Sequence, residues 1–118
     1  MNAGSLSGMK IMQLSSRVFV SAQIMVDDLS IVAAHGFRTI VNNRPDGEAA
    51  GQPMSDDLAA AAADLGIAFM HIPVVSGSIT EQDVADFGHA CDNLEGPILL
   101  FCRSGTRSSI LWKLSTER

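Results

Sequence analysis

Only two cysteines occur among the 118 residues, too few for a small secreted protein held together by disulfides. Apolar runs cover a handful of residues, far short of the roughly 20 that a membrane-spanning helix needs. The N-terminus lacks the basic stretch, apolar core and cleavage site of a signal peptide. A net charge of −5 argues against nucleic acid or a membrane surface as partner. We therefore expect a soluble, cytoplasmic domain that binds neither.

The chain is long enough for one domain with a sizeable apolar core. Hydrophobic residues make up 47% of it and charged residues 18%, which excludes an intrinsically disordered chain. Residues 1–8 are small and polar, and we predict that they form a flexible leader. Residues 9–118 are then expected to form a single catalytic domain.

Strand-like and helix-like segments alternate along this domain. The expected strands are 17–22, 37–41, 67–72 and 98–101; the expected helices are 27–35, 55–66 with Ser55 as N-cap, 80–95 opened by a Thr80 capping box, and one from about Arg107. This alternation predicts an α/β fold, a mostly parallel sheet with helices on both faces. The carboxyl ends of parallel strands meet at one edge, so segments 42–46, 71–76 and 102–108 should surround one crevice.

The segment after the last expected strand is the most informative one for chemistry. The apolar run Ile98-Leu99-Leu100-Phe101 delivers Cys102 to a short loop that leads directly into a helix. Unpaired N–H groups and the dipole at a helix N-terminus stabilise an anion, a thiolate included. The sequence therefore predicts Cys102 as a thiolate nucleophile. Its expected helpers are the cations Arg103 and Arg107, the turn residue Gly105 and the hydrogen-bond donors Ser104, Thr106 and Ser108.

The alternative for Cys102 is a buried structural cysteine, because free cysteines are among the most buried residues. The polar, basic sequence that follows it favours the reactive interpretation. Cys91 is different, since it lies on the apolar stripe of a predicted helix with Phe87 and Leu94. We predict that Cys91 packs in the core.

The loop Cys102-Arg103-Ser104-Gly105-Thr106-Arg107-Ser108 resembles the active-site loop of single-domain rhodaneses and the phosphate loop of cysteine-dependent phosphatases. Together with segments 42–48, 71–74 and 96–97, it is similar to the beta-lactamase-hydrolase-like, phosphatase-like domain family. The resemblance runs from Leu14 to the end of the chain. It implies a fold of the dual-specificity or tyrosine phosphatase type. Members of the family are described both as phosphatase-like and as sulfurtransferases.

Three departures from the phosphatase pattern favour sulfur transfer. Four residues separate Cys102 from Arg107, where phosphatases have five; Phe101 replaces a typical histidine; and segment 74–78 has no acid to protonate a leaving group. The preferred interpretation is therefore a sulfurtransferase that forms a Cys102 persulfide from thiosulfate or a low-molecular-weight persulfide. The alternatives are a phosphatase with a phosphocysteine intermediate and a non-catalytic anion-binding or redox-sensing module. All three take a small anion as ligand.

Three residues outside the loop are candidate accessory groups. Arg44 is expected either to contact distal substrate oxygens or to pair on the surface with Asp46 or Glu48. Asp46 is a candidate replacement acid, although its Pro-Asp-Gly context favours a turn. His71 is a candidate proton carrier.

No metal or other cofactor is expected, because the three histidines show no metal-ligand spacing with one another or with the cysteines. The family resemblance also implies a possible partner, a metallo-hydrolase-type domain or protein.

Overall fold

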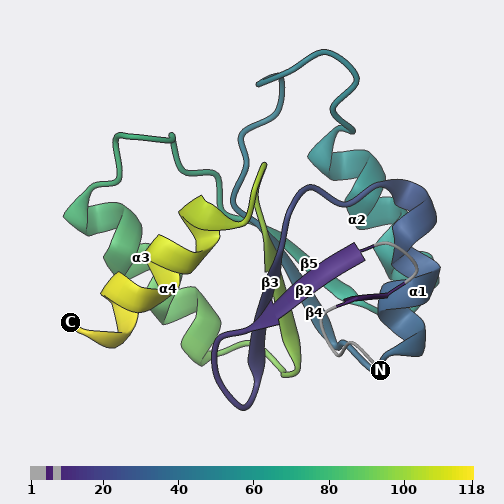
Figure 1. Ribbon diagram of the computed structural model, residues 1–118, viewed down its shortest axis with the longest axis horizontal. Helices are drawn as coiled ribbons and strands as arrows, with labels where there is room; N and C mark the ends of the chain where they lie inside the picture. The colour runs from purple at the N-terminus through teal and green to yellow at the C-terminus, as the bar shows by residue number, and fades with distance from the viewer. Residues whose placement is uncertain (1–4, 7–8) are drawn as a thin grey trace.

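The computed structural model describes residues 5–6 and 9–118, which form a six-stranded sheet with helices on both faces (Figure 1). The strands are β1 (Ser5–Leu6), β2 (Met9–Gln13), β3 (Val18–Ser21), β4 (Thr39–Asn42), β5 (Ala68–His71) and β6 (Ile98–Phe101). The helices are the 3-10 turn η1 (Val26–Asp28), α1 (Leu29–Ala34), α2 (Ser55–Asp64), α3 (Glu81–Asp92) and α4 (Thr106–Thr116). The order β1-β2-β3-β6-β4-β5 is parallel from β3 to β5 and antiparallel at β1 and β2. The predicted α/β architecture is confirmed.

Strand β6 lies in the middle of the sheet and contributes to both hydrophobic cores. Ile98 and Leu100 pack with Phe87 of α3 and Leu111 of α4, whereas the alternate residues of β6 pack on the opposite face with α1 and α2. Alternate residues of a strand point to opposite faces, so a continuous apolar run is expected in a strand covered on both sides. This run places the residue after β6 at the end of a fully buried strand.

The carboxyl ends of the parallel strands lie level with one another. Phe101 is in register with Ser21 of β3 and with Asn42 of β4, and Asn42 is in register with His71 of β5. The N–H of Asn43 donates to the carbonyl of Phe101 (2.9 Å), so the chain after β4 stays against β6. The predicted gathering of segments 42–46, 71–76 and 102–108 at one edge is thus confirmed.

Helix α2 begins differently from the prediction. Ser55 is the first helical residue and Met54 is the N-cap, so the assignment of Ser55 as N-cap was wrong. The Ser55 N–H donates to Oδ1 of Asp46 (2.8 Å), and its hydroxyl accepts from Nδ2 of Asn42 (3.1 Å). A carboxylate nine residues earlier in the chain therefore replaces the local cap. The capping box predicted at Thr80 is present: the Asp83 N–H donates to the Thr80 hydroxyl, and the Thr80 N–H donates to Oδ2 of Asp83 (both 3.0 Å).

The N-terminal edge of the sheet also differs from the prediction. Ser5–Leu6, within the expected leader, forms β1 and pairs with β2; the other residues of that leader lie outside the described part of the chain. Strand β2, which the alternation did not predict, pairs with β3 and widens the sheet. Of the helices in residues 9–118, none has the length and apolar character needed to cross a bilayer.

Candidate active site in the Cys102 loop

Cys102 lies directly after β6, where the chain turns sharply into α4. The N–H of Gly105 donates to its sulfur (3.1 Å), and Gly105 itself has φ +94°, a left-handed conformation that suits glycine. Cys102 is only 1% exposed, yet it borders a small hollow described below. The Gly105 amide of the loop therefore contacts the sulfur.

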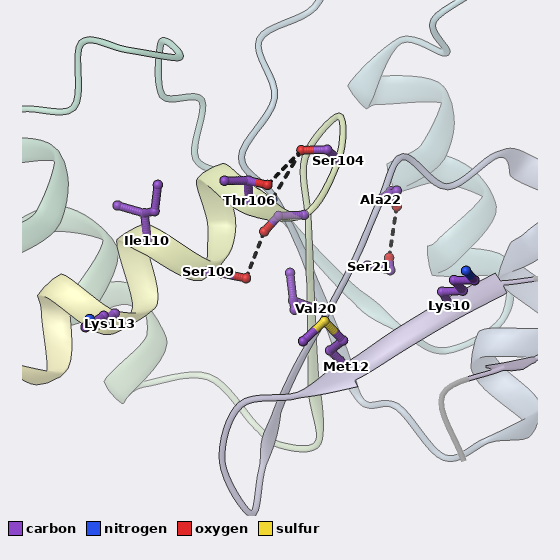
Figure 2. Close-up of a pocket in the computed structure, with 11 residues that line it drawn as sticks. Lys10, Met12, Val20, Ser21, Ala22, Ser104, Thr106, Ser109, Ile110 and Lys113 are labelled. Atoms are coloured by element: carbon purple, nitrogen blue, oxygen red, sulfur yellow. Dashed lines mark hydrogen bonds between the residues drawn. The ribbon is translucent and has the colours of Figure 1, made fainter. Parts of the chain in front are cut away.

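The backbone amides where the loop enters α4 donate hydrogen bonds either to the Cys102 sulfur or to other atoms of the loop. The Gly105 N–H donates to Cys102, and the Thr106 N–H donates to Oγ of Ser104 (3.3 Å). Figure 2 shows the hydroxyls of Ser104 and Thr106, 3.1 Å apart, at the tip of the loop. The N–H groups of Arg107 and Ser108 have no partner within a helix that starts here, because the first turn lacks acceptors. Amides of this kind at a helix N-terminus can bind an anion.

Gly105→Ala is expected to lower both stability and activity. Forcing alanine to φ +94° costs about 1–2 kcal/mol of folding free energy, and relaxation of that strain would move the amide that contacts Cys102. The matched control is Gly66→Ala, which imposes a similar strain at φ +75° with no neighbour within 4 Å. Urea unfolding and turnover measure the two effects. Equal activity in the two variants would contradict a role for the Gly105 amide.

The hollow beside Cys102 has a volume of about 150 Å³, the size of a small anion with part of its substituent. Two arginines border it, and none of its described lining residues is an aspartate or glutamate. Its lining consists of Ser76, Gly77, Ile79, Cys102, Arg103, Ser104, Thr106, Arg107 and Ile110. A positive hollow in a chain of net charge −5 favours an anionic ligand.

Arg107 is held in place by Glu48, a residue that the sequence suggested only as a surface partner of Arg44. Its Nη1 and Nη2 each donate to one carboxylate oxygen of Glu48 (both 3.1 Å), and Nη1 also donates to the carbonyl of Val74 (2.9 Å). The Nε of Arg107 is buried and has no partner among the described residues. A buried, charged donor beside the hollow is suited to an anion that enters it.

Glu48 joins Arg107 to a second buried arginine. Arg44 is 4% exposed; its Nε donates to Oε1 of Glu48 (2.9 Å) and its Nη1 to Oε1 of Gln23 (3.0 Å). Hydrogen bonds from Arg107, and then from Arg44, lower the pKa of Glu48 against the opposing effect of burial. The expected pairing of Arg44 with Glu48 is present, but the pair is not on the surface because Arg44 is buried, and Arg44 does not line the hollow. The charge of Glu48 fixes both guanidinium groups.

Ser108 has a different partner from the one predicted. Its buried hydroxyl donates to Oδ1 of Asn43 (2.8 Å), while Nδ2 of Asn43 donates to the carbonyl of Ile72 (3.0 Å). The expectation that this hydroxyl donates to Cys102 or to a ligand is corrected, because its proton is already bound. Ser108 instead connects α4 to the segment after β4.

The remaining predicted residues fall into two groups. Arg103 borders the hollow, and its carbonyl accepts from the Gln23 N–H (3.1 Å), which ties the loop to the end of β3. Asp46 serves the start of α2, and Nε2 of His71 lies 2.8 Å from the Arg44 carbonyl; neither lines the hollow. The turn interpretation of Asp46 thus describes its position better than the acid interpretation.

Cys91 packs in the core of α3 as predicted, and burial raises the pKa of its thiol to about 12. No three His, Cys, Asp or Glu side chains of residues 9–118 come together as metal ligands.

The sequence model of a family described as "Beta-lactamase hydrolase-like protein, phosphatase-like domain" matches residues 10–118. A beta-lactamase hydrolase-like protein from Xylella fastidiosa is 42% identical over 107 residues, which are 91% of this chain and 25% of the relative. The corresponding protein from Agrobacterium fabrum is 37% identical over 90% of this chain and 25% of its own length. The chain thus spans about a quarter of the length of these curated relatives.

Solved structures show the same fold. A candidate phosphatase from Neisseria meningitidis superposes with a TM-score of 0.82 and 35% identity, covering 86% of this chain and 72% of that one. The catalytic core of a PP-IP phosphatase from S. cerevisiae has a TM-score of 0.70 at 15% identity, covering 86% and 60%. The fold is therefore phosphatase-like. These likenesses support the phosphatase alternative more than sulfur transfer, the interpretation that the sequence alone favoured.

Proposed function

This chain belongs to the family of phosphatase-like domains of beta-lactamase hydrolase-like proteins, and from that premise we propose that it is a cysteine-dependent enzyme that cleaves phosphate esters or anhydrides. The proposal rests on the observation that Cys102 and the buried cation Arg107 border the same hollow. The Nε of Arg107 also has no partner among the described residues. A nucleophile and an oxyanion-binding group next to each other are the minimum that phosphoryl transfer requires.

The proposed reaction has two steps. The Cys102 thiolate attacks phosphorus, the bond from phosphorus to the leaving oxygen breaks, and a phosphocysteine forms. Water then attacks phosphorus, the S–P bond breaks, inorganic phosphate leaves and the thiolate is restored. Arg107 and the first amides of α4 stabilise the negative charge that spreads over the non-bridging oxygens during both steps.

The rate should depend steeply on the acidity of the leaving group. No carboxyl group lines the hollow within the described residues, so the departing oxygen receives no proton from one there. A positioned general acid contributes about a hundredfold or more to such reactions. Aryl phosphates of acidic phenols, or phosphoanhydrides, should therefore be turned over at least about a hundredfold faster than alkyl phosphates. Rates that are flat across a series of phenols would reveal a proton donor in the site.

Sulfur transfer is the second candidate function, and two observations favour it. The four residues between Cys102 and Arg107 make a shorter loop than that of phosphatases, and no acid of residues 9–118 lines the hollow. Here the thiolate attacks the outer sulfur of thiosulfate, the S–S bond breaks, sulfite leaves and a Cys102 persulfide remains. An acceptor such as cyanide then takes that sulfur as thiocyanate. Neither leaving group needs a proton.

Parallel assays separate the two candidates. The protein is incubated with a nitrophenyl phosphate and, separately, with thiosulfate and cyanide, and its intact mass is recorded after treatment with thiosulfate alone. Phosphate release is the expected result. Thiocyanate formation together with the mass of one added sulfur, and no phosphate release, would replace the phosphatase proposal with sulfur transfer.

A further inference from the structure

A second, larger hollow lies on the other side of the Cys102 loop. This hollow, called here the lysine groove, has a volume of about 520 Å³ and runs between α4 and strands β2 and β3 (Figure 2). It is lined by Lys10, Met12, Val20, Ser21, Ala22, Ser104, Gly105, Thr106, Ser109, Ile110 and Lys113. The sequence did not predict this groove, and the proposed reaction does not involve it.

The lysine groove is distinguished by its charge. The chain has two lysines in all, Lys10 and Lys113, and both line this groove. In Figure 2 they lie at opposite ends of it, with Val20, Met12 and Ser109 between them. No aspartate or glutamate occurs among its described lining residues, although the whole sequence has 13 acids. The groove is therefore a positive surface on an acidic protein.

Between the two lysines the surface is apolar. Met12 is 66% exposed and Ile110 is 43% exposed, which are high values for large hydrophobic side chains. Val20 forms part of the floor. A ligand that matches this surface has an apolar body and an anionic end, because each part then meets its complement.

The lysine groove is adjacent to the hollow beside Cys102. Ser104, Thr106 and Ile110 line both, so the exposed side of the first turns of α4 forms a common border. A group held at Cys102 and an apolar chain lying over Thr106 and Ile110 would lead directly into the groove. One molecule of modest length can occupy both.

We propose that the lysine groove binds the distal part of the substrate, an apolar stem that ends in a second anionic group, which Lys10 or Lys113 recognises at its end of the groove. The substrate class is thus a small organic dianion: one end reacts at Cys102, and the other is a carboxylate or a second phosphate. The inference rests on the proposed function only in taking Cys102 as the reacting group.

Affinity labelling of Cys102 tests the groove without any turnover. The reagents are iodoacetamidohexanoate, its neutral methyl ester and the phosphonate of equal length. In each case the Cys102 sulfur bonds to the methylene carbon and iodide leaves. The two anionic reagents place their charge in the groove. We expect one or both to label Cys102 about fivefold faster than the ester at low salt, as one favourable ion pair predicts. The faster one identifies the distal group.

Variants locate the effect. Lys10→Gln combined with Lys113→Gln should abolish the advantage of the anionic reagents. Arg38→Gln, which removes a charge from an exposed ion pair with Glu95 before β4, should retain it. An unchanged advantage in the double lysine variant, or equal rates for all three reagents in the unmodified protein, would overturn the proposal. Labelling that meets the expectation while no phosphate ester is cleaved would count against the proposed function alone.

Sedimentation tests the other occupant of an apolar groove, a second copy of this chain. The unmodified protein and a Met12→Ser variant are compared across a range of concentrations. A monomer in both cases is the expected result. A dimer that Met12→Ser dissociates would show that a second copy fills the groove and would overturn the assignment to substrate.

Discussion

Cys102→Ser is expected to lower turnover by about a thousandfold or more while leaving the fold intact. A serine hydroxyl is far less nucleophilic at neutral pH than a thiolate, and removal of a covalent nucleophile typically has effects of this size or larger. The side chain accepts one hydrogen bond, from Gly105, which an oxygen can also accept. The free energy of unfolding should therefore change by no more than about 1 kcal/mol. Steady-state kinetics and urea unfolding measure the two quantities.

The matched control is Cys91→Ala. Cys91 lies in the core under α3, where burial raises the pKa of its thiol to about 12, so it is protonated and unreactive at neutral pH. Its truncation should cost about 1 kcal/mol of stability and leave turnover unchanged. Loss of activity in the Cys91 variant, together with normal activity in Cys102→Ser, would show that the reactive sulfur is that of Cys91 and would contradict this prediction.

Glu48→Gln is expected to have the second largest effect, on both binding and stability. It removes the negative charge that lies between Arg44 and Arg107 and leaves two buried cations next to each other. The side chain of Glu48 is 25% exposed, so solvent reduces the cost to about 2 kcal/mol, below that of breaking a fully buried pair. Because Arg107 then loses its fixed position, KM should rise and kcat should fall, together by about 10- to 100-fold in kcat/KM.

The pH dependence gives this prediction a second readout. The arginines lower the folded-state pKa of Glu48 below its usual value of 4.5, so its contribution to stability is fully present above that value. The contribution is lost as the pH falls below 4.5 through the folded-state pKa. The difference in unfolding free energy between wild type and Glu48→Gln should therefore be largest at neutral pH and shrink in acid. Glu95→Gln, at an exposed ion pair with Arg38, should show little difference at any pH.

The parts of the fold that follow from local sequence were predictable. The continuous apolar run Ile98–Phe101 is a strand with the predicted bounds, and the Thr80 capping box opens α3. Strand β2 was missed because its sequence, MKIMQ, is short and has a single buried position, Ile11. The start of α2 was misassigned because its first N–H is bound by Asp46, a residue whose proximity arises only in the folded chain.

In the candidate site, too, the features that follow from local sequence were predictable and those that depend on long-range contacts were not. The position of Cys102 before a helix, and of Arg107 next to it, could be predicted because strand, loop and helix follow one another in sequence. The role of Glu48 could not, because it depends on a contact across 59 residues with Arg107. The one local signal was the spacing of four residues between Arg44 and Glu48, which shows a pair but not its burial. Lys10 and Lys113 likewise line one groove only in the folded chain, because they lie on β2 and α4.

Strand β6 anchors the reactive loop in the part of the molecule that both hydrophobic cores hold. Local opening near this strand would disturb the packing above and below the sheet at once, so its amides should exchange with solvent among the slowest in the domain. The Cys102 sulfur, which directly follows β6, is consequently attached to a rigid part of the molecule. A ligand then has to fit the loop in this one conformation. The preference for one ligand over another therefore depends on the side chains around the rim of the loop, because these can change in sequence without disturbing either core.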